Sequence, residues 1–127
     1  MSKMSYVKFK TPDNLQSEIK KVLNGIAKTR GSKIRKGMNE TTKSLERGVA
    51  KLVVMAEDVS PPEILFHMPI LCDEKGIPYG YIKKQEDLGN AVRINVAASS
   101  IAIEDAGSSE NEQDLNNLIN KIGNLSK

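Results

Sequence analysis

The chain has 127 residues, 39% of them hydrophobic and 28% charged, which predicts a globular domain rather than a disordered chain. No apolar run approaches the roughly 20 residues of a membrane-spanning helix, and Met1–Lys10 lacks the apolar core of a signal peptide. A single cysteine excludes an internal disulfide, and a single histidine cannot build a His-rich metal site with it. We therefore expect a cytoplasmic protein without metal or cofactor.

The net charge of +3 is unevenly distributed along the chain. Residues 1–51 carry thirteen Lys and Arg against four Asp and Glu (+9), whereas residues 52–127 carry six against twelve (−6). This polarity predicts a basic face for a polyanion, and the alternative is a solvated basic helix without a partner. Aromatic residues make up only 4%, which argues against an aromatic platform that stacks unpaired bases.

The first predicted helix follows a loose or short extended leader at Met1–Lys10. Thr11 is the expected N-cap, with Pro12 at the first helical position. Apolar residues then recur at helical spacing as far as Ile26, and Gly31 ends the helix.

A short extended segment at Ser32–Lys36 leads into a turn and a second helix. Asn39 is the expected N-cap of this helix, and Glu40 lies favourably in its first turn. The apolar run Lys51–Ala56 (KLVVMA) is typical of a strand buried on both faces.

The second half of the chain continues the alternation of helices and strands. A third helix is expected from Pro61-Pro62 to Cys72, and Pro69 should kink or divide it. Its successors are a strand at Tyr79–Ile82, a helix at Lys84–Val92, a loop with exposed apolar residues at Arg93–Ser99, a strand at Ser100–Glu104 and an amphipathic helix at Ser108–Asn124. The alternation predicts an α/β fold, a three-layer α/β/α sandwich around a mixed sheet of about four strands. Since no repeat or linker divides residues 1–127, we expect one domain.

Few residues suggest catalysis. His67 lies among apolar residues of a predicted helix, and Cys72, five positions on, does not share its helix face. Glu57 and Asp58 follow a strand, where α/β enzymes often place carboxylates, but adjacent side chains point in different directions. The sequence also lacks a phosphate-binding glycine motif and a nucleophile elbow. A small hydrolase is therefore the least favoured hypothesis, and we predict that the protein is not an enzyme.

The strongest candidate site lies before and within the second predicted helix. Asn39, Lys43 and Arg47 are spaced i, i+4, i+8, so they share one helix face, with Glu40 beside them. Such a face could read a guanine edge, Glu40 accepting from N–H groups and Lys43 donating to O6 or N7. The helix start, with Lys36 just before it, suits a phosphate. The alternative is an ordinary capped surface helix with an internal Glu–Lys pair.

The segment Lys36–Lys43 (KGMNETTK), continuing through Glu46-Arg47-Gly48, closely resembles the signature helix of the ribosomal protein L7Ae family in its archaeal form. The resemblance spans nearly all of residues 5–105 in order, whereas the last helix matches only in character. Its further segments are Ala50–Val59, Pro61–Glu63, His67–Cys72, Ile77–Tyr79, Leu88-Gly89 and Val96–Ser99. The chain departs from the family pattern at four places, which are Met38, Ser60, Gln85-Glu86-Asp87 and Asn95.

The resemblance implies an α/β/α sandwich that binds kink-turns, duplex RNAs bent sharply at a three-nucleotide bulge beside tandem sheared G·A pairs. Carried over by position, nine residues would contact the RNA in three groups. These are Asn39, Glu40 and Lys43 on the G·A guanines, Lys36, Gly37 and Arg47 on the backbone, and Ile94, Asn95 and Val96 against the flipped-out bulge nucleotide. The kink would open a major groove that is otherwise too narrow to read, and the protein would capture the kinked RNA conformer.

The resemblance also implies particular assemblies. Family members belong to the large ribosomal subunit and, in archaea, to box C/D and H/ACA guide particles and RNase P. The implied partners are rRNA, the guide RNAs and RNase P RNA, with a Nop-domain protein and fibrillarin in the guide particle. We expect a monomer in isolation and no membrane partner. The leading alternative is a protein–protein interaction module of the same fold without its own RNA specificity, which the acidic half and Pro61–Cys72 suggest.

Overall fold

The described part of the chain, residues 5–125 of this computed structural model, alternates helices and strands as predicted. Its elements are α1 (Asp13–Ala27), β1 (Lys33–Lys36), α2 (Met38–Glu46), β2 (Leu52–Ala56), the 3-10 helix η1 (Pro62–Leu65), α3 (His67–Lys75), β3 (Tyr79–Ile82), α4 (Gln85–Ala91), β4 (Ser100–Asp105) and α5 (Ser109–Leu125). The predicted bounds of β3, α4, β4 and α5 are correct to within one residue. None of the helices in this described part is long and apolar enough to cross a membrane.

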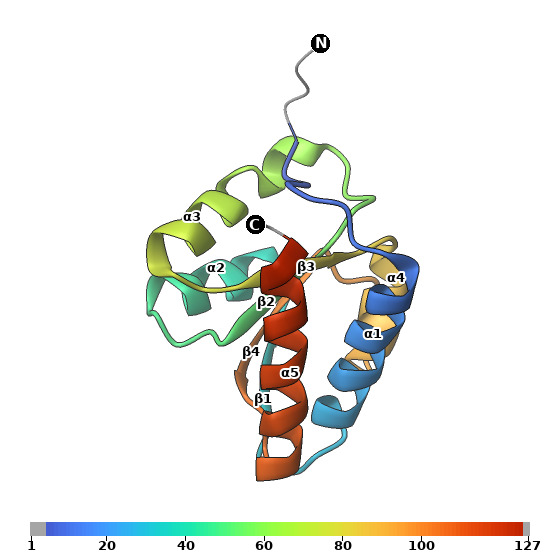
Figure 1. Cartoon of the computed structure of the whole chain (residues 1–127). Helices are drawn as coiled ribbons and strands as arrows, with labels where there is room; N and C mark the ends of the chain where they lie inside the picture. Colours follow the sequence, from blue (N-terminus) through green and yellow to red (C-terminus); the bar gives the residue numbers. More distant parts are fainter. Residues whose placement is uncertain (1–4, 126–127) are drawn as a thin grey trace.

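The four strands form one mixed sheet in the order β1-β4-β2-β3. Strands β2 and β3 are parallel, whereas β4 runs antiparallel to both β1 and β2. Helices α1, α4 and α5 pack together on one side of the sheet, and α2 packs against α3 on the other (Figure 1). All five residues of β2 are buried because helices cover both faces of the sheet. The predicted α/β/α sandwich is therefore confirmed.

The N-terminal segment is anchored to the sheet. Residues 1–4 lie outside the described residues, but Tyr6 is only 1% exposed. Its hydroxyl donates to the carbonyl of Ala56 and accepts a hydrogen bond from the amide of Val59, while the hydroxyl of Tyr81 donates to the carbonyl of Tyr6. Of the two forms predicted for the leader, loose or short extended, the loose one is therefore wrong for residues 5–10, because a buried aromatic ring with a satisfied hydroxyl holds this segment in place.

Helix α1 is shorter than predicted at both ends. Pro12 has ψ 151°, outside the helical region, and is itself the cap residue, so Thr11 is not the N-cap. The carbonyl of Pro12 accepts hydrogen bonds from the amides of residues 15 and 16, at 3.0 and 2.9 Å. The helix ends at Ala27 rather than at Gly31, since Gly31 belongs to the turn that leads into β1.

The third predicted helix is divided, but not by its proline. Helices η1 and α3 meet at Phe66, and α3 continues past Cys72 to Lys75. Pro69 is the third residue of α3, where a missing amide hydrogen costs no helical hydrogen bond because first-turn amides have no partner within the helix. Gly76, in the left-handed conformation at φ 67°, ends α3.

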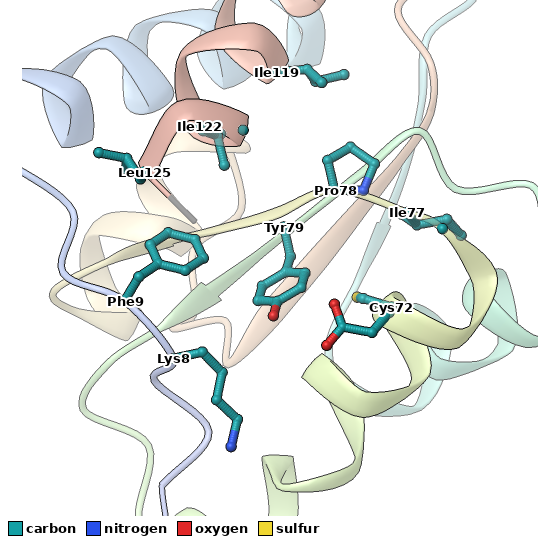
Figure 2. Close-up of a pocket in the computed structure, with 12 residues that line it drawn as sticks. Lys8, Phe9, Cys72, Ile77, Pro78, Tyr79, Ile119, Ile122 and Leu125 are labelled. Atoms are coloured by element: carbon teal, nitrogen blue, oxygen red, sulfur yellow. The ribbon is translucent and has the colours of Figure 1, made fainter. Parts of the chain in front are cut away.

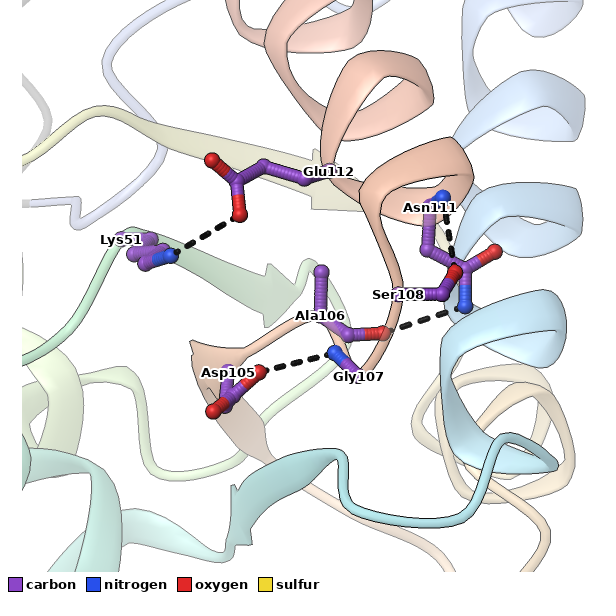
Figure 3. A network of polar contacts seen from close by, with 7 residues as sticks. All are labelled: Lys51, Asp105, Ala106, Gly107, Ser108, Asn111 and Glu112. Carbon is purple, nitrogen blue, oxygen red and sulfur yellow. Dashed lines mark hydrogen bonds and ion pairs between the residues drawn. The ribbon is translucent and has the colours of Figure 1, made fainter.

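Polar contacts join the end of β4 to the start of α5 (Figure 3). The hydroxyl of Ser108 accepts a hydrogen bond from the amide of Asn111 at 3.1 Å and so caps α5. The side-chain amide of Asn111 donates to the carbonyl of Ala106 at 3.1 Å and to the hydroxyl of Thr29 at 2.8 Å. Because Thr29 follows α1, these contacts fix α1 against α5.

Candidate nucleic-acid interface

Helix α2 turns a polar face to solvent. Its buried residues are Thr41, Ser44 and Leu45, which face the rest of the fold. With about 3.6 residues per turn, Asn39 and Lys43 lie on the opposite side, and both are exposed. Arg47, the exposed cap residue after α2, keeps helical backbone angles and continues this face. The structure therefore brings Asn39, Lys43 and Arg47 together on one accessible surface.

Glu40 and Lys43 form an ion pair on this face. The Nζ atom of Lys43 lies 3.5 Å from Oε2 of Glu40, and the two side chains are 54% and 48% exposed. An exposed pair of this kind contributes little to stability because water and salt screen it. Both side chains can therefore leave each other for another partner at little cost.

The start of α2 depends on Gly37. This residue caps the helix with φ 96° and ψ 161°, a conformation that favours glycine, and its amide donates to the carbonyl of Ser100 at 2.8 Å. Asn39 is thus the second helical residue, and the prediction that it is the N-cap is wrong. The bond to Ser100 sets the turn one residue before the helix begins. No described side chain caps this helix, so its first-turn amides are left for water or a ligand.

The loop that contains Ile94, Asn95 and Val96 is held over α4 by backbone hydrogen bonds. The amide of Ile94 donates to the carbonyl of Gly89 at 3.1 Å, and the amide of Ala98 donates to that of Gln85 at 3.0 Å. Ile94 is half-buried against the core, whereas Val96 is 68% exposed. The loop thus presents an apolar side chain to solvent, as predicted.

The helix start and the loop lie at the same end of the sheet. Lys36, the last residue of β1, pairs with Ile101 in antiparallel β4. The loop enters β4 at Ser100, whose carbonyl accepts the hydrogen bond from Gly37. The start of α2 and the end of the loop therefore meet at one end of the sheet, although the two segments of predicted RNA-contacting residues, 36–47 and 94–96, are nearly fifty residues apart in sequence.

A half-buried ion pair joins the neighbouring strands β1 and β4, and sequence analysis missed it. The Nε atom of Arg35 in β1 is 3.2 Å from Oε1 of Glu104 in β4, whose side chain is 10% exposed. Burial raises the pKa of Glu104, but the nearby Ser44 hydroxyl and Arg35 guanidinium outweigh it and hold this pKa below its usual value. The ion pair joins β1 to β4. The acidic residues Glu104 and Asp105 at the end of β4 were the only feature of the sequence that pointed to this ion pair.

Among the candidate catalytic residues, His67 and Asp58 form hydrogen bonds that join elements of the fold, and Cys72 is buried. His67 is bonded to Thr42, with Nε2 and Oγ1 3.0 Å apart, which links α3 to α2. Burial, with the charge of a neighbouring aspartate, raises the pKa of Cys72 to about 12, so its thiol stays protonated at neutral pH. Asp58 accepts a hydrogen bond from the amide of Gln85. Within residues 5–125, no three His, Cys, Asp or Glu side chains gather to hold a metal ion.

A hollow of about 680 Å³ lies elsewhere, between the N-terminal segment, α3, β3 and α5 (Figure 2). Its walls carry apolar side chains such as Phe9, Tyr79 and Ile122 together with the polar side chains of Lys8 and Asp73. Phe9 and Tyr79 also pack with Tyr81, which in turn contacts Tyr6, so four of the five aromatic rings gather in this region. None of the nine predicted RNA-contacting residues lines the hollow. The candidate interface is therefore an open surface without an aromatic cluster.

These features define an α/β/α protein whose candidate site is an exposed polar helix face beside an apolar loop. Residues 17–113 match the sequence model of the Ribosomal protein L7Ae/L30e/S12e/Gadd45 family, and the chain therefore belongs to this family. It is also similar to the solved structure of the Giardia lamblia 15.5kD RNA binding protein, at 27% identity and a TM-score of 0.85. That match covers 98% of this chain and 99% of the other. Both comparisons support RNA binding within the family.

Proposed function

We propose that this protein binds RNA through the surface formed by α2 and the Ile94–Val96 loop, and that it recognises kink-turns. The observation that carries the proposal is the hydrogen bond from Gly37 to Ser100, which holds the start of α2 and the loop at one end of the β1–β4 pair. A surface that presents polar groups and an apolar side chain together suits an RNA with both an opened groove and an extruded base.

The three groups of side chains have distinct roles in this proposal. Asn39, Glu40 and Lys43 contact the guanines of the G·A pairs, because the exposed Glu40–Lys43 pair can exchange its partner for base edges at little cost. Lys36, Gly37 and Arg47 hold the phosphate backbone at the uncapped start and the exposed end of α2. Ile94, Asn95 and Val96 pack against the flipped-out nucleotide.

The proposed assemblies follow from this single RNA fold. An RNA that contains a kink-turn offers the same surface in rRNA, box C/D and H/ACA guide RNAs or RNase P RNA. We therefore propose a role in the large ribosomal subunit, the guide particles and RNase P, with a Nop-domain protein and fibrillarin joining once guide RNA is bound. The role is one of binding and shaping RNA, without catalysis.

The test compares a kink-turn RNA with the same RNA after Watson–Crick pairs replace its G·A pairs. Affinities are measured at one fixed salt concentration, because phosphate contacts make all RNA binding salt-dependent. We expect much tighter binding to the kink-turn and fluorescence-detected bending of that RNA on binding. Equal affinities for the two RNAs would remove the claim of kink-turn recognition.

A second candidate function is protein docking on the side of η1 and α3. Ile64 and Ile70 are 39% and 56% exposed there and offer apolar surface to a partner. A pull-down with and without kink-turn RNA separates the two ideas, with charge reversal at Glu63 as the matched variant. Partner capture that is independent of RNA favours an interaction module, whereas RNA-dependent capture favours assembly on the RNA complex.

A further inference from the structure

Gln85, the first residue of α4, joins two distant segments of the chain. Its amide donates to Oδ1 of Asp58 at 2.9 Å, and its side-chain amide donates to the carbonyl of Asp58 at 3.4 Å. Its own carbonyl accepts the hydrogen bond from the amide of Ala98. One residue therefore connects the carboxylate of Asp58 to the loop that carries Ile94–Val96.

Asp58 serves as the cap of α4 although it lies 27 residues away in sequence. Lys84, which precedes the helix, forms no side-chain cap, so Asp58 supplies the acceptor that a local Ser or Asp would otherwise provide. Helix α4 has only seven residues, and so short a helix owes its position to contacts with the rest of the protein. The position of its first turn is thus sensitive to Asp58.

Asp58 is itself held firmly from both sides. The hydroxyl of Tyr6 bonds the carbonyl of Ala56 and the amide of Val59. The amide of Glu57 donates to the carbonyl of Ile82 at 2.9 Å. The backbone around Asp58 is therefore fixed to β3 and to the N-terminal segment, and its exposed carboxylate is aimed at α4 by a rigid support.

We propose that Asp58 is a positioning residue for RNA recognition. By holding Gln85, it sets the position of α4 and, through Ala98, the position of the Ile94–Val96 loop against which the extruded nucleotide packs. This inference rests on the proposed function. Asp58 acts through the loop and donates no group to the RNA, and its negative charge alone would repel phosphate. The departure at Gln85 from the basic stretch of the family thus leaves the junction intact, since two of its three bonds use the backbone.

The test is a double-mutant cycle between the protein and the bulge nucleotide. The Asp58→Ala and Asp58→Asn variants are titrated with an intact kink-turn RNA and with one whose extruded nucleotide is abasic. Asp58→Ala should weaken binding to the intact RNA about fivefold, the factor that corresponds to the loss of one helix cap. It should weaken binding to the abasic RNA far less, because the loop has no base to contact. Asp58→Asn keeps the acceptor oxygen and should behave like the native protein.

The Glu110→Ala variant is the charge-matched control, since it removes an exposed carboxylate from the first turn of α5 rather than from the α4 junction. Its affinities for the intact and the abasic RNA should equal those of the native protein. Equal losses on intact and abasic RNA in Asp58→Ala would overturn the inference, as would an Asp58→Asn variant as weak as Asp58→Ala. If the native protein fails to prefer the kink-turn over its Watson–Crick version, the proposed function fails instead, so the two failures are distinguishable.

A second pair of variants tests the hydrogen bond between Gln85 and Asp58 by changing Gln85. Gln85→Pro removes the amide hydrogen, and proline is favoured at the first helical position. Lys84, at φ −123° and ψ 138°, already has the extended backbone that a following proline requires. Gln85→Ala keeps the amide and loses only the side chain. Gln85→Pro should reproduce the loss of Asp58→Ala and Gln85→Ala should not, whereas equal behaviour of the two would contradict the inference.

Discussion

Gly89 lies directly against the carbonyl oxygen of Val96, so that a Cβ atom added at Gly89 would stand 2.0 Å from this oxygen. Such a distance is far below any contact that two atoms tolerate, and the obstacle is backbone rather than a flexible side chain. Glycine at this position is therefore what allows the apolar loop to cross α4 closely, and the loop's place in the candidate interface depends on it.

Gly89→Ala should displace the loop and lower the free energy of unfolding by about 1–3 kcal/mol, the usual cost of overpacking. Urea denaturation measures this loss, and binding to kink-turn RNA should weaken in parallel. Gly25→Ala in α1 is the control, because its new Cβ would meet its nearest neighbour at 3.8 Å. That control should be stabilised by roughly 0.5–1 kcal/mol. A Gly89→Ala protein as stable as the native one would contradict the role given to this contact.

Glu40→Ala should reduce selectivity more than general RNA affinity. Its carboxylate is proposed to accept hydrogen bonds from guanine, and a lost base contact costs ~1–3 kcal/mol of discrimination. The measurement is the ratio of affinities for the kink-turn RNA and its Watson–Crick version. Removal of a negative charge should leave binding to the Watson–Crick RNA unchanged or slightly tighter. An unchanged ratio would exclude Glu40 from base recognition.

Lys36→Ala should weaken binding to both RNAs by the same factor. A phosphate contact carries no sequence information, and its loss should reduce the slope of log affinity against log salt by about 1. Lys121→Ala, which removes a cation paired with Glu18 between α5 and α1, is the control and should leave the slope unchanged. A change in selectivity with an unaltered slope would assign Lys36 to another role.

Tyr6→Phe should lower the free energy of unfolding by about 1–3 kcal/mol, because it leaves a buried carbonyl and a buried amide without their shared partner. Tyr79→Phe serves as the control, since the hydroxyl of Tyr79 bonds the exposed Asp73 and its loss should cost less. Urea denaturation of both variants makes the comparison. Equal stability of Tyr6→Phe and the native protein would show that the hydroxyl of Tyr6 contributes nothing to anchoring the N-terminal segment.

Glu104→Gln should lower stability at neutral pH and lose this effect in acid. The folded state holds the pKa of Glu104 below its usual value, so the carboxylate stabilises the fold above that usual value. The stabilisation disappears as the pH falls through the lower, folded-state pKa. The difference in urea midpoint between the native protein and Glu104→Gln should therefore shrink on acidification from pH 7. A difference that is constant with pH would contradict this assignment.

Local sequence patterns determined the fold class and the side chains that share the exposed face of α2. Helical spacing places Asn39, Lys43 and Arg47 on one face whatever else surrounds them, because a helix repeats about every 3.6 residues. The continuous apolar run of β2 requires cover on both faces of the sheet, and together with the alternation of elements it predicts the α/β/α sandwich. These conclusions need only residues that are near one another in the chain.

Only the tertiary structure decided how these parts are fitted together. Because Gly37 bonds to Ser100, helix α2 is capped at Gly37 and not at Asn39. The hydroxyl of Tyr6 anchors the N-terminal segment, whose sequence did not indicate this contact. Asp58 caps a helix that begins 27 residues further on. Each of these contacts joins residues far apart in sequence, and their hydrogen bonds form only because folding brings unpaired backbone groups within reach of one another.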